Sequence, residues 1–204
     1  MTIQPYHKYV FDARKRKFVG RFEKMYANED KEHFDSWFQD DVSDFSRRFS
    51  SWLINQNRYS SILDVGCGKG TFTNLLKKNG NRIVGVDISR TAIAKAKSRY
   101  PGIYFLTRTV NQALEEKGSW DLIVMMEVLS YLKDWREIIQ KASHRGRRIF
   151  ISLYLPPKPI GFVRSFSSLK KSLTKYFEIE MELLWKGEHI FLMGNSRLKG
   201  KGKL

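Results

Sequence analysis

The sequence predicts an α/β fold: a mostly parallel sheet with helices on both faces, a helical extension before it and an antiparallel hairpin at its end. From Ser60 onward, short apolar runs alternate with helical patterns, which is typical of strand-helix-strand units around a parallel sheet. Two long strand-like runs later flank a tight turn at Lys186–Glu188, which predicts an antiparallel pair. A chain of 204 residues without an internal repeat fits one compact domain.

Residues 1–58 are predicted to form the helical extension. Apolar and aromatic side chains recur there at helical spacing, which predicts two or three amphipathic helices. These side chains are Phe18, Phe22, Met25, Tyr26, Phe34, Trp37, Phe38, Val42, Phe45, Phe49, Trp52 and Leu53. We expect them either to pack as an ordinary aromatic core or to form a lid over a pocket.

Residues 59–196 are predicted to form the sheet with its helices, and residues 197–204 a basic tail. Apolar runs predict strands at Ser61–Val65, Arg82–Val86, Ile103–Thr107, Asp121–Met125 and Arg148–Leu153. Helical patterns predict helices at Thr71–Lys78, Arg90–Arg99, Asp134–Ala142 and Phe166–Lys175. The hairpin is expected to pair Tyr176–Trp185 with His189–Asn195.

The net charge of +16 is the most unusual feature of the composition. It gives information about binding partners more than about the fold. Lys141–Leu204 carries fourteen basic residues against four acidic ones, whereas Phe22–Asp44 carries eight acidic residues against two lysines. The basic runs Arg14–Lys17 and Lys199–Lys203 are either solvated segments or contacts for an anionic partner.

Cysteine usage and hydropathy predict a cytoplasmic protein. Cys67 is the only cysteine, so neither an intrachain disulfide nor a cysteine-based zinc cluster is expected. The first ten residues lack the continuous apolar block of a signal peptide. No stretch approaches the roughly 20 apolar residues that a membrane helix needs.

A glycine-rich turn directly follows the first predicted strand. The apolar run Ile62–Val65 leads into Gly66-Cys67-Gly68-Lys69-Gly70, and a predicted helix begins at Thr71. This is the layout of a nucleotide-type cofactor site at the carboxyl end of a strand. The spacing Gly-x-Gly-x-Gly differs from the Gly-x-Gly-x-x-Gly of dinucleotide binders, because Thr71 stands where their third glycine would be.

Two acidic residues indicate what this turn binds. Asp64 stands two residues before Gly66, where a carboxylate would repel a pyrophosphate and attract a ligand that carries an ammonium and a sulfonium group. Asp87 ends the second apolar strand 21 positions after Gly66. That offset is close to the roughly 20 residues at which an acid accepts hydrogen bonds from ribose hydroxyls.

These motifs resemble those of the class I S-adenosylmethionine-dependent methyltransferases. The first motif is Leu63–Gly70 and the second is Gly85–Ser89, while Trp120–Leu132 is similar to the fourth-strand segment of the small-molecule branch, particularly the nodulation-type N-methyltransferases. The resemblance covers residues 60–155. It implies a Rossmann-like sheet of seven strands in the order 3-2-1-4-5-7-6 with the last strand antiparallel. It also implies S-adenosyl-L-methionine as the cofactor and S-adenosyl-L-homocysteine as its product.

The resemblance implies a set of cofactor contacts. These residues are Asp64, Gly66, Cys67, Gly68, Gly70, Asp87, Ile88, Thr109, Val110, Asn111 and Met126. Many relatives carry an acidic residue near position 109 to meet the adenine amino group, whereas this chain has Thr109. The adenine contact is therefore expected from the backbone of Thr109 and Val110 or from the side chain of Asn111.

Glu127 and Tyr131, after the fourth strand, are the predicted catalytic residues. Either they act on the acceptor, or Tyr131 only packs on the cofactor and Glu127 only hydrogen-bonds backbone. Metal-dependent relatives carry Glu-x-x-Glu-His here, and two of those ligands are missing, so no metal is expected. The four histidines share no ligand spacing and are expected on the surface or in turns. Acceptor entry is expected past Tyr26, Trp37, Tyr154, Phe162 and Arg164.

The predicted function is methyl transfer to an oxygen or nitrogen atom of a small molecule. Little chain lies outside the core, which favours a compact acceptor of the sugar, nucleotide-linked or natural-product type, with an anionic group to match the positive charge. The basic C-terminal third favours the first alternative, an RNA or tRNA methyltransferase. The second alternative is a non-catalytic protein that binds the cofactor. The acceptor atom and the oligomeric state stay open.

Overall fold

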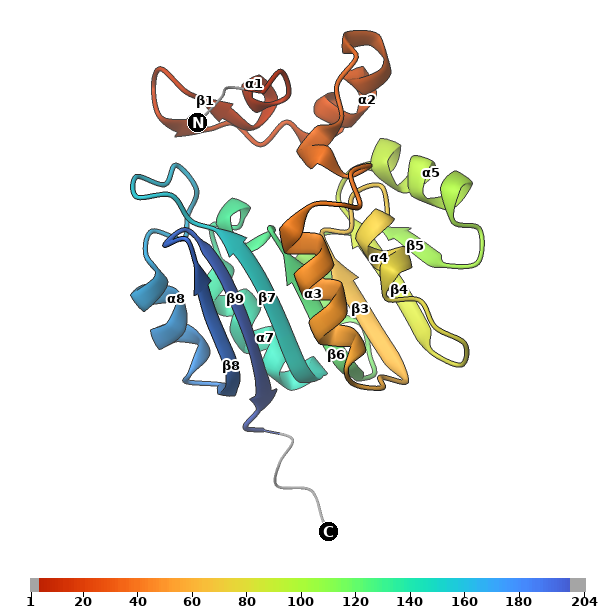
Figure 1. The fold of residues 1–204 in the computed structure, drawn as a ribbon, viewed down its shortest axis with the longest axis vertical. Helices are drawn as coiled ribbons and strands as arrows, with labels where there is room; N and C mark the ends of the chain where they lie inside the picture. Colours follow the sequence, from red (N-terminus) through yellow and green to blue (C-terminus); the bar gives the residue numbers. More distant parts are fainter. Residues whose placement is uncertain (1–3, 199–204) are drawn as a thin grey trace.

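The computed structural model describes residues 4–198, and its centre is a seven-stranded sheet with the order β5-β4-β3-β6-β7-β9-β8 (Figure 1). Strands β3 to β7 pair in parallel, and β9 is antiparallel to both β7 and β8. The expected strand order and the antiparallel last strand are thus confirmed. The strands are β3 (Ser61–Val65), β4 (Arg82–Asp87), β5 (Tyr104–Thr107), β6 (Trp120–Met126), β7 (Gly146–Tyr154), β8 (Phe177–Trp185) and β9 (His189–Ser196).

Helices cover both faces of the sheet because alternate strand residues point to opposite sides. Ile123 and Met125 of β6 belong to one apolar cluster, and Leu122 and Val124 to another. The first cluster packs against α6 (Val110–Glu115), α7 (Trp135–Arg145) and α8 (Phe166–Leu173). The second packs against α3 (Phe45–Asn55), α4 (Thr71–Leu75) and α5 (Arg90–Arg99).

Two helices between the strands differ from the sequence prediction. Helix α4 ends at Leu75 and not near Lys78, because Asn81 turns the chain with hydrogen bonds to the Lys78 amide and the Leu76 carbonyl. Helix α6 was not predicted. Its signal was present in the sequence as a capping box, in which Thr109 and Gln112 hydrogen-bond each other's backbone amides.

The N-terminal extension up to α3 lies across the carboxyl ends of the parallel strands, whereas α3 itself packs on a face of the sheet (Figure 1). Two of the expected helices are present as α2 (Phe22–Glu32) and α3, with a short 3-10 turn, η1 (Ser36–Phe38), between them. Before them the chain forms α1 (His7–Val10) and a small hairpin of β1 (Phe11–Asp12) and β2 (Lys17–Phe18), neither of which was predicted. The basic run 14–17 supplies the exposed turn of this hairpin. The second basic run, 199–203, lies outside the described residues.

Between residues 4 and 198, no helix combines the length and apolarity that crossing a membrane requires.

Because the sheet is packed on both faces, we expect a core residue and an edge residue to differ in their effect on stability. Phe150 in β7 is fully buried, whereas Tyr104 in edge strand β5 is 73% exposed. Phe150→Ala should lower the free energy of unfolding by about 3–5 kcal/mol, because it leaves a cavity at the centre of the sheet. Tyr104→Ala should change it by no more than about 0.5 kcal/mol. Urea unfolding measures both, and equal losses would contradict this packing.

Candidate active site

A cavity of about 960 Å³ lies between the carboxyl ends of the strands and the N-terminal extension. One half is bounded by the ends of β3, β4 and β5, and the other by the ends of β6 and β7 and the start of β9. Ligands of open α/β sheets bind at this edge. Eleven of the thirteen site residues predicted from the sequence line the cavity; Gly68 and Gly70 do not.

The glycine turn after β3 takes a backbone path that other residues would resist. Gly66 has φ +76°, and a Cβ atom there would lie 2.7 Å from a methyl group of Val128. Gly68 also has a positive φ, and its amide donates a hydrogen bond to Asp87. Gly70 faces the core, since a Cβ atom there would lie 2.6 Å from the Phe105 ring. Gly66 therefore opens the cavity wall, while Gly70 permits close packing of α4.

Asp64, which is buried, and Asp87, which is half-buried, form a negative site in the first half of the cavity. The Asp64 carboxylate accepts a hydrogen bond of 2.6 Å from the Thr73 hydroxyl. Burial, with Asp87 adding to it, raises the pKa of Asp64 to about 7. Asp87 accepts from the amides of Gly68 at 3.0 Å and Ser89 at 2.9 Å, and burial still raises the pKa of its carboxyl group.

Within the described part of the chain, neither carboxylate forms an ion pair. Buried carboxylates without a cation are unfavourable, so this half of the cavity is suited to a ligand that brings positive charge and hydroxyl donors. A sulfonium nucleoside with an ammonium group has both. The residues present thus fit S-adenosylmethionine.

The residues expected around adenine divide into two groups. Ile88 is 58% exposed although it is apolar, and it lines the cavity as a free apolar surface for a flat base. Thr109 and Asn111 also line the cavity, but their side chains are already engaged. Thr109 caps α6, and the Asn111 amide donates to Asp134 and accepts from Lys141. The Thr109 backbone is engaged too, because its amide donates to the Gln112 side chain and its carbonyl accepts from the Ala113 amide. Of the sources considered for the adenine contact, the Val110 amide is therefore the candidate that remains.

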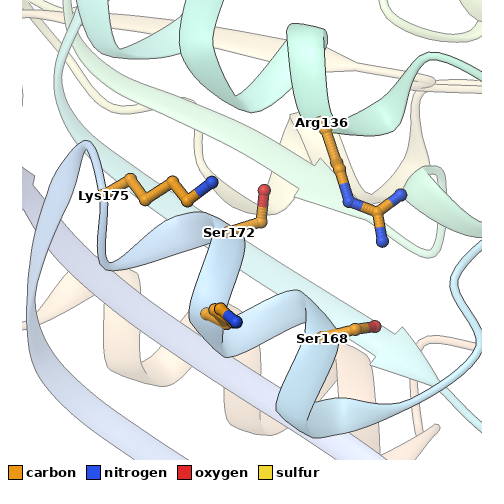
Figure 2. A pocket seen from close by; sticks show the side chains of 5 residues that line it. Arg136, Ser168, Ser172 and Lys175 are labelled. Carbon is orange, nitrogen blue, oxygen red and sulfur yellow. The ribbon is translucent and has the colours of Figure 1, made fainter.

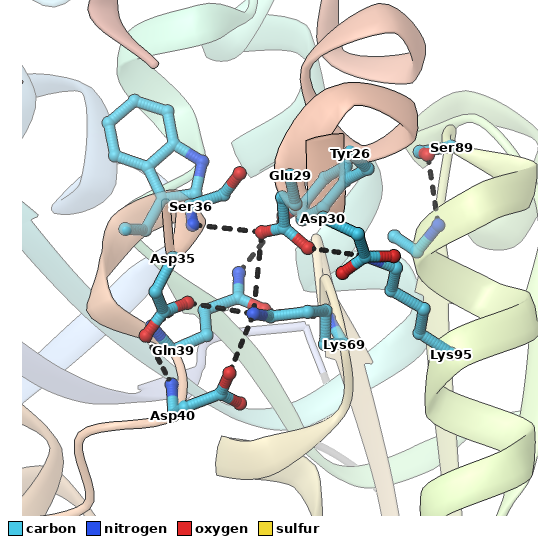
Figure 3. A network of polar contacts seen from close by, with 12 residues as sticks. Tyr26, Glu29, Asp30, Asp35, Ser36, Gln39, Asp40, Lys69, Ser89 and Lys95 are labelled. Carbon is cyan, nitrogen blue, oxygen red and sulfur yellow. Dashed lines mark hydrogen bonds and ion pairs between the residues drawn. The ribbon is translucent and has the colours of Figure 1, made fainter. Parts of the chain in front are cut away.

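Charged and polar contacts fix the extension onto the glycine turn (Figure 3). The Lys69 ammonium lies 2.7 Å from Asp35, 3.0 Å from Asp40 and 3.3 Å from Glu29. Burial opposes this charge, but hydrogen bonds to Asp35 and Asp40 keep the pKa of Lys69 above its usual value. Gln39 accepts from the Lys69 amide at 2.7 Å. The extension and the cofactor turn are therefore held together at the turn itself.

The second half of the cavity contains the two predicted catalytic residues. Glu127 has φ +57°, and its carboxylate accepts hydrogen bonds from the Ser152 hydroxyl at 3.0 Å and the Tyr154 amide at 2.6 Å. Burial raises the pKa of Glu127. Tyr131 packs among aromatic rings of the extension, including Trp37 at 5.4 Å between ring centroids. Burial raises the pKa of its phenol well above 10, so Tyr131 stays protonated at neutral pH.

The structure also changes the expected acceptor entrance. Tyr26, Trp37 and Tyr154 line the cavity as expected, but Phe162 and Arg164 do not. The Phe162 ring packs on Phe18, and the Arg164 guanidinium donates to the Pro159 carbonyl.

Further residues of this half were not predicted from the sequence. Ser46, Arg47 and His189 line the cavity. His189 was expected on the surface or in a turn, and it begins β9, half-buried at the cavity wall. No local motif marks these residues, because they meet only when the extension folds over the sheet. Within residues 4–198 no cluster of three or more potential metal ligands is present.

The strand order and the acid-flanked glycine turn define the class I S-adenosylmethionine-dependent methyltransferases. A family model described as a methyltransferase domain matches residues 34–185. The chain therefore belongs to the methyltransferase domain family, whose class I members use S-adenosylmethionine as cofactor.

Two curated relatives have sequences similar to this chain. The ubiquinone biosynthesis O-methyltransferase of Colwellia psychrerythraea is 31% identical over 120 residues, which is 56% of this chain and 44% of the relative. Nodulation protein S of Bradyrhizobium diazoefficiens is 30% identical over 134 residues, 63% of this chain and 61% of the relative. The chain thus spans less than two thirds of the length of these relatives.

Solved structures share the fold at lower identity. The N-methyltransferase NodS of Bradyrhizobium japonicum superposes with a TM-score of 0.66 at 20% identity, covering 78% of this chain and 99% of that one. Magnesium protoporphyrin IX methyltransferase of Synechocystis, solved with bound S-adenosylmethionine, gives 0.62 at 18% identity, covering 74% and 78%.

The hydrogen bonds of Asp87 lead to a prediction about cofactor affinity. In Asp87→Asn an amide nitrogen replaces one acceptor oxygen, so one backbone N–H loses its partner and the charge is removed. Affinity for S-adenosylhomocysteine should fall at least about 100-fold, or about 2.7 kcal/mol. The matched control is Asp30→Asn in the extension, whose carboxylate is 89% exposed. Calorimetric titration should find the control within about twofold of wild type; equal affinities for both variants would contradict the assignment of Asp87.

Proposed function

We propose that this protein transfers the methyl group of S-adenosylmethionine to an oxygen or nitrogen atom of a small-molecule acceptor. The observation that carries the proposal is the single cavity that runs from the Asp64 and Asp87 carboxylates to Glu127 beneath the extension. Its volume lies near the upper end of the range of about 300–1,000 Å³ for small-molecule sites. It thus has the size for a nucleoside cofactor and a compact acceptor together.

The bound cofactor supplies a methyl group on a positively charged sulfur. Asp64, Asp87 and the glycine turn would hold it, with Cys67, Ile88 and Met126 as apolar wall. Residues 4–44, which precede α3, would act as a lid that excludes water and orients the acceptor. Glu127 and Tyr131 would contact the acceptor, Glu127 through a carboxylate that Ser152 and Tyr154 fix in place.

The names of the relatives support both an oxygen and a nitrogen atom as the acceptor of the methyl group. They include O-methyltransferases of ubiquinone biosynthesis and an N-methyltransferase, NodS. Arg16 and Lys158 line the same cavity, and Arg16 donates to the Lys158 carbonyl. This basic rim supports an acceptor that carries an anionic group.

A separate basic pocket favours the second candidate, an RNA methyltransferase. It has a volume of about 230 Å³ between α7 and α8, and its cations are Arg136, Lys171 and Lys175 (Figure 2). Ser168 and Ser172 add hydroxyl groups. A phosphate backbone could be held here, outside the methyl-transfer cavity.

Transfer of a labelled methyl group tests these alternatives. We expect label from S-adenosylmethionine in at least one member of a panel of hydroxybenzoates, amino sugars and nucleotide sugars, and none in total tRNA. Labelled tRNA together with an RNA gel shift that weakens as salt rises would favour the RNA enzyme. Binding of S-adenosylhomocysteine with no transfer to any of these would favour the non-catalytic protein.

A further inference from the structure

Methyl transfer to a hydroxyl or a protonated amine requires a group that removes a proton from the acceptor. Four side chains in the acceptor half of the cavity could do so: His7, Asp44, Glu127 and His189. The contacts that each of them already makes distinguish between them.

The two carboxylates are occupied by hydrogen bonds. Asp44 caps helix α3 by accepting from the Arg47 amide at 3.0 Å. Both oxygens of Glu127 accept hydrogen bonds, from Ser152 and Tyr154. A carboxylate held in this way is better suited to orient an acceptor than to change its protonation state during each turnover, because protonation would weaken the bonds that fix it.

The two histidines differ in which ring nitrogen is available. Nδ1 of His7 accepts a hydrogen bond of 3.1 Å from the Gln4 amide. The neutral His7 ring therefore carries its proton on Nε2 and has no free lone pair to offer the cavity. Nδ1 of His189 faces a hydroxyl, Ser46 Oγ, at 3.4 Å. Unlike the Gln4 amide, a hydroxyl can accept a hydrogen bond from Nδ1–H, so the tautomer in which Nε2 of His189 keeps its lone pair is open to this ring.

Packing fixes the His189 ring at the cavity wall. Its centroid lies 4.8 Å from the Tyr154 ring and 5.4 Å from the Trp185 ring. In the sheet, His189 pairs directly with Tyr154, whose amide donates to Glu127. His189 and Glu127 are thus positioned through the same residue of β7, on the same side of the cavity.

We propose that His189 is the general base of the reaction, with Ser46 as the residue that sets its tautomer; this rests on the proposed function above. With a hydroxyl acceptor, Nε2 of His189 takes the O–H proton while the oxygen forms its bond to the methyl carbon. With a protonated amine, Nε2 takes the N–H proton first, and the lone pair that this releases then forms the bond to the methyl carbon. The carbon–sulfur bond breaks, its electron pair stays on sulfur, and the sulfonium becomes a neutral thioether. The imidazolium then loses its proton to water.

The charges around His189 set the direction of the pH dependence. Burial lowers the pKa of His189 below 6.5 and Lys186 adds to this, while Asp44 and Glu188 oppose it. Glu127 and Arg47 line the same half of the cavity. A lowered pKa keeps the ring neutral at pH 7, so transfer should slow as the pH falls through a value below 6.5 and should be constant above it.

Nitrogen-15 NMR of the imidazole rings tests the tautomer without requiring turnover. In the complex with S-adenosylhomocysteine, His189 should carry its proton on Nδ1 and His7 on Nε2. A pH titration should place the His189 midpoint below 6.5. A His189 ring with its proton on Nε2, or with a midpoint above about 7, would overturn the proposal.

The kinetic test uses 3,4-dihydroxybenzoate, a flat hydroxylated acid that matches the aromatic walls and the basic rim. In single turnovers with the enzyme in excess of the acceptor and S-adenosylmethionine saturating at every pH, His189→Gln should lower the plateau rate about 10²–10⁴-fold. It should also remove the acid limb, which is the fall of the rate at low pH. His7→Gln should keep that limb. Ser46→Ala should lower the rate less than His189→Gln and shift the midpoint of the limb, and it also serves if His189→Gln fails to fold.

Affinity for S-adenosylhomocysteine should be unchanged in His189→Gln, which separates the acceptor step from the cofactor site. A wild-type acid limb that persists in His189→Gln would overturn the proposal. If wild-type protein binds S-adenosylhomocysteine but does not methylate 3,4-dihydroxybenzoate, this result counts against a hydroxybenzoate acceptor. The tautomer of His189 measured by NMR then decides whether His189 can act as the base.

Discussion

Two carboxylates without a cationic partner among the described residues are the constraint on which the account of this protein depends. Asp64 and Asp87 lie at the carboxyl ends of adjacent parallel strands. Burial raises the pKa of both carboxyl groups, and the charge of Asp87 adds to the shift at Asp64. In the described part of the chain their hydrogen bonds come from neutral donors: a threonine hydroxyl and two backbone amides. A cationic nucleoside completes the electrostatics of this edge of the sheet, which explains why the glycine turn and the extension are built around it.

The extension is coupled to this site through the same turn. Lys69 stands between two glycines and binds three carboxylates of the extension, while Lys95 of α5 binds Glu29 and Asp30. Four of the eight acidic residues of this segment therefore have a structural use, because Glu29, Asp30, Asp35 and Asp40 pair with Lys69 or Lys95. The acceptor half is formed by the same closure, which brings Ser46 of the extension to His189 at the other end of the chain.

Local patterns were sufficient to predict most of the fold. The apolar runs and the tight turn at Lys186–Glu188 predicted all seven strands within a few residues, and the acid spacing predicted Asp64 and Asp87 at one edge. Helix α6 was missed although its capping box was readable. The pairing of His189 with Ser46 in the acceptor half could not be predicted, since the two residues are 143 positions apart and no local motif marks either of them. The side-chain role of Asn111 likewise depended on contacts with Asp134 and Lys141 that no local pattern shows.

The titration of the Asp64 carboxyl group tests the central claim most directly. Carbon-13 NMR from about pH 5 to about pH 9 would follow it in the free protein and in the complex with S-adenosylhomocysteine, whose ammonium group supplies the cation. The account predicts a midpoint of about 7 in the free protein and a midpoint lower by at least about one unit in the complex. An unchanged midpoint in the complex would show that no cation approaches Asp64, and it would contradict the account.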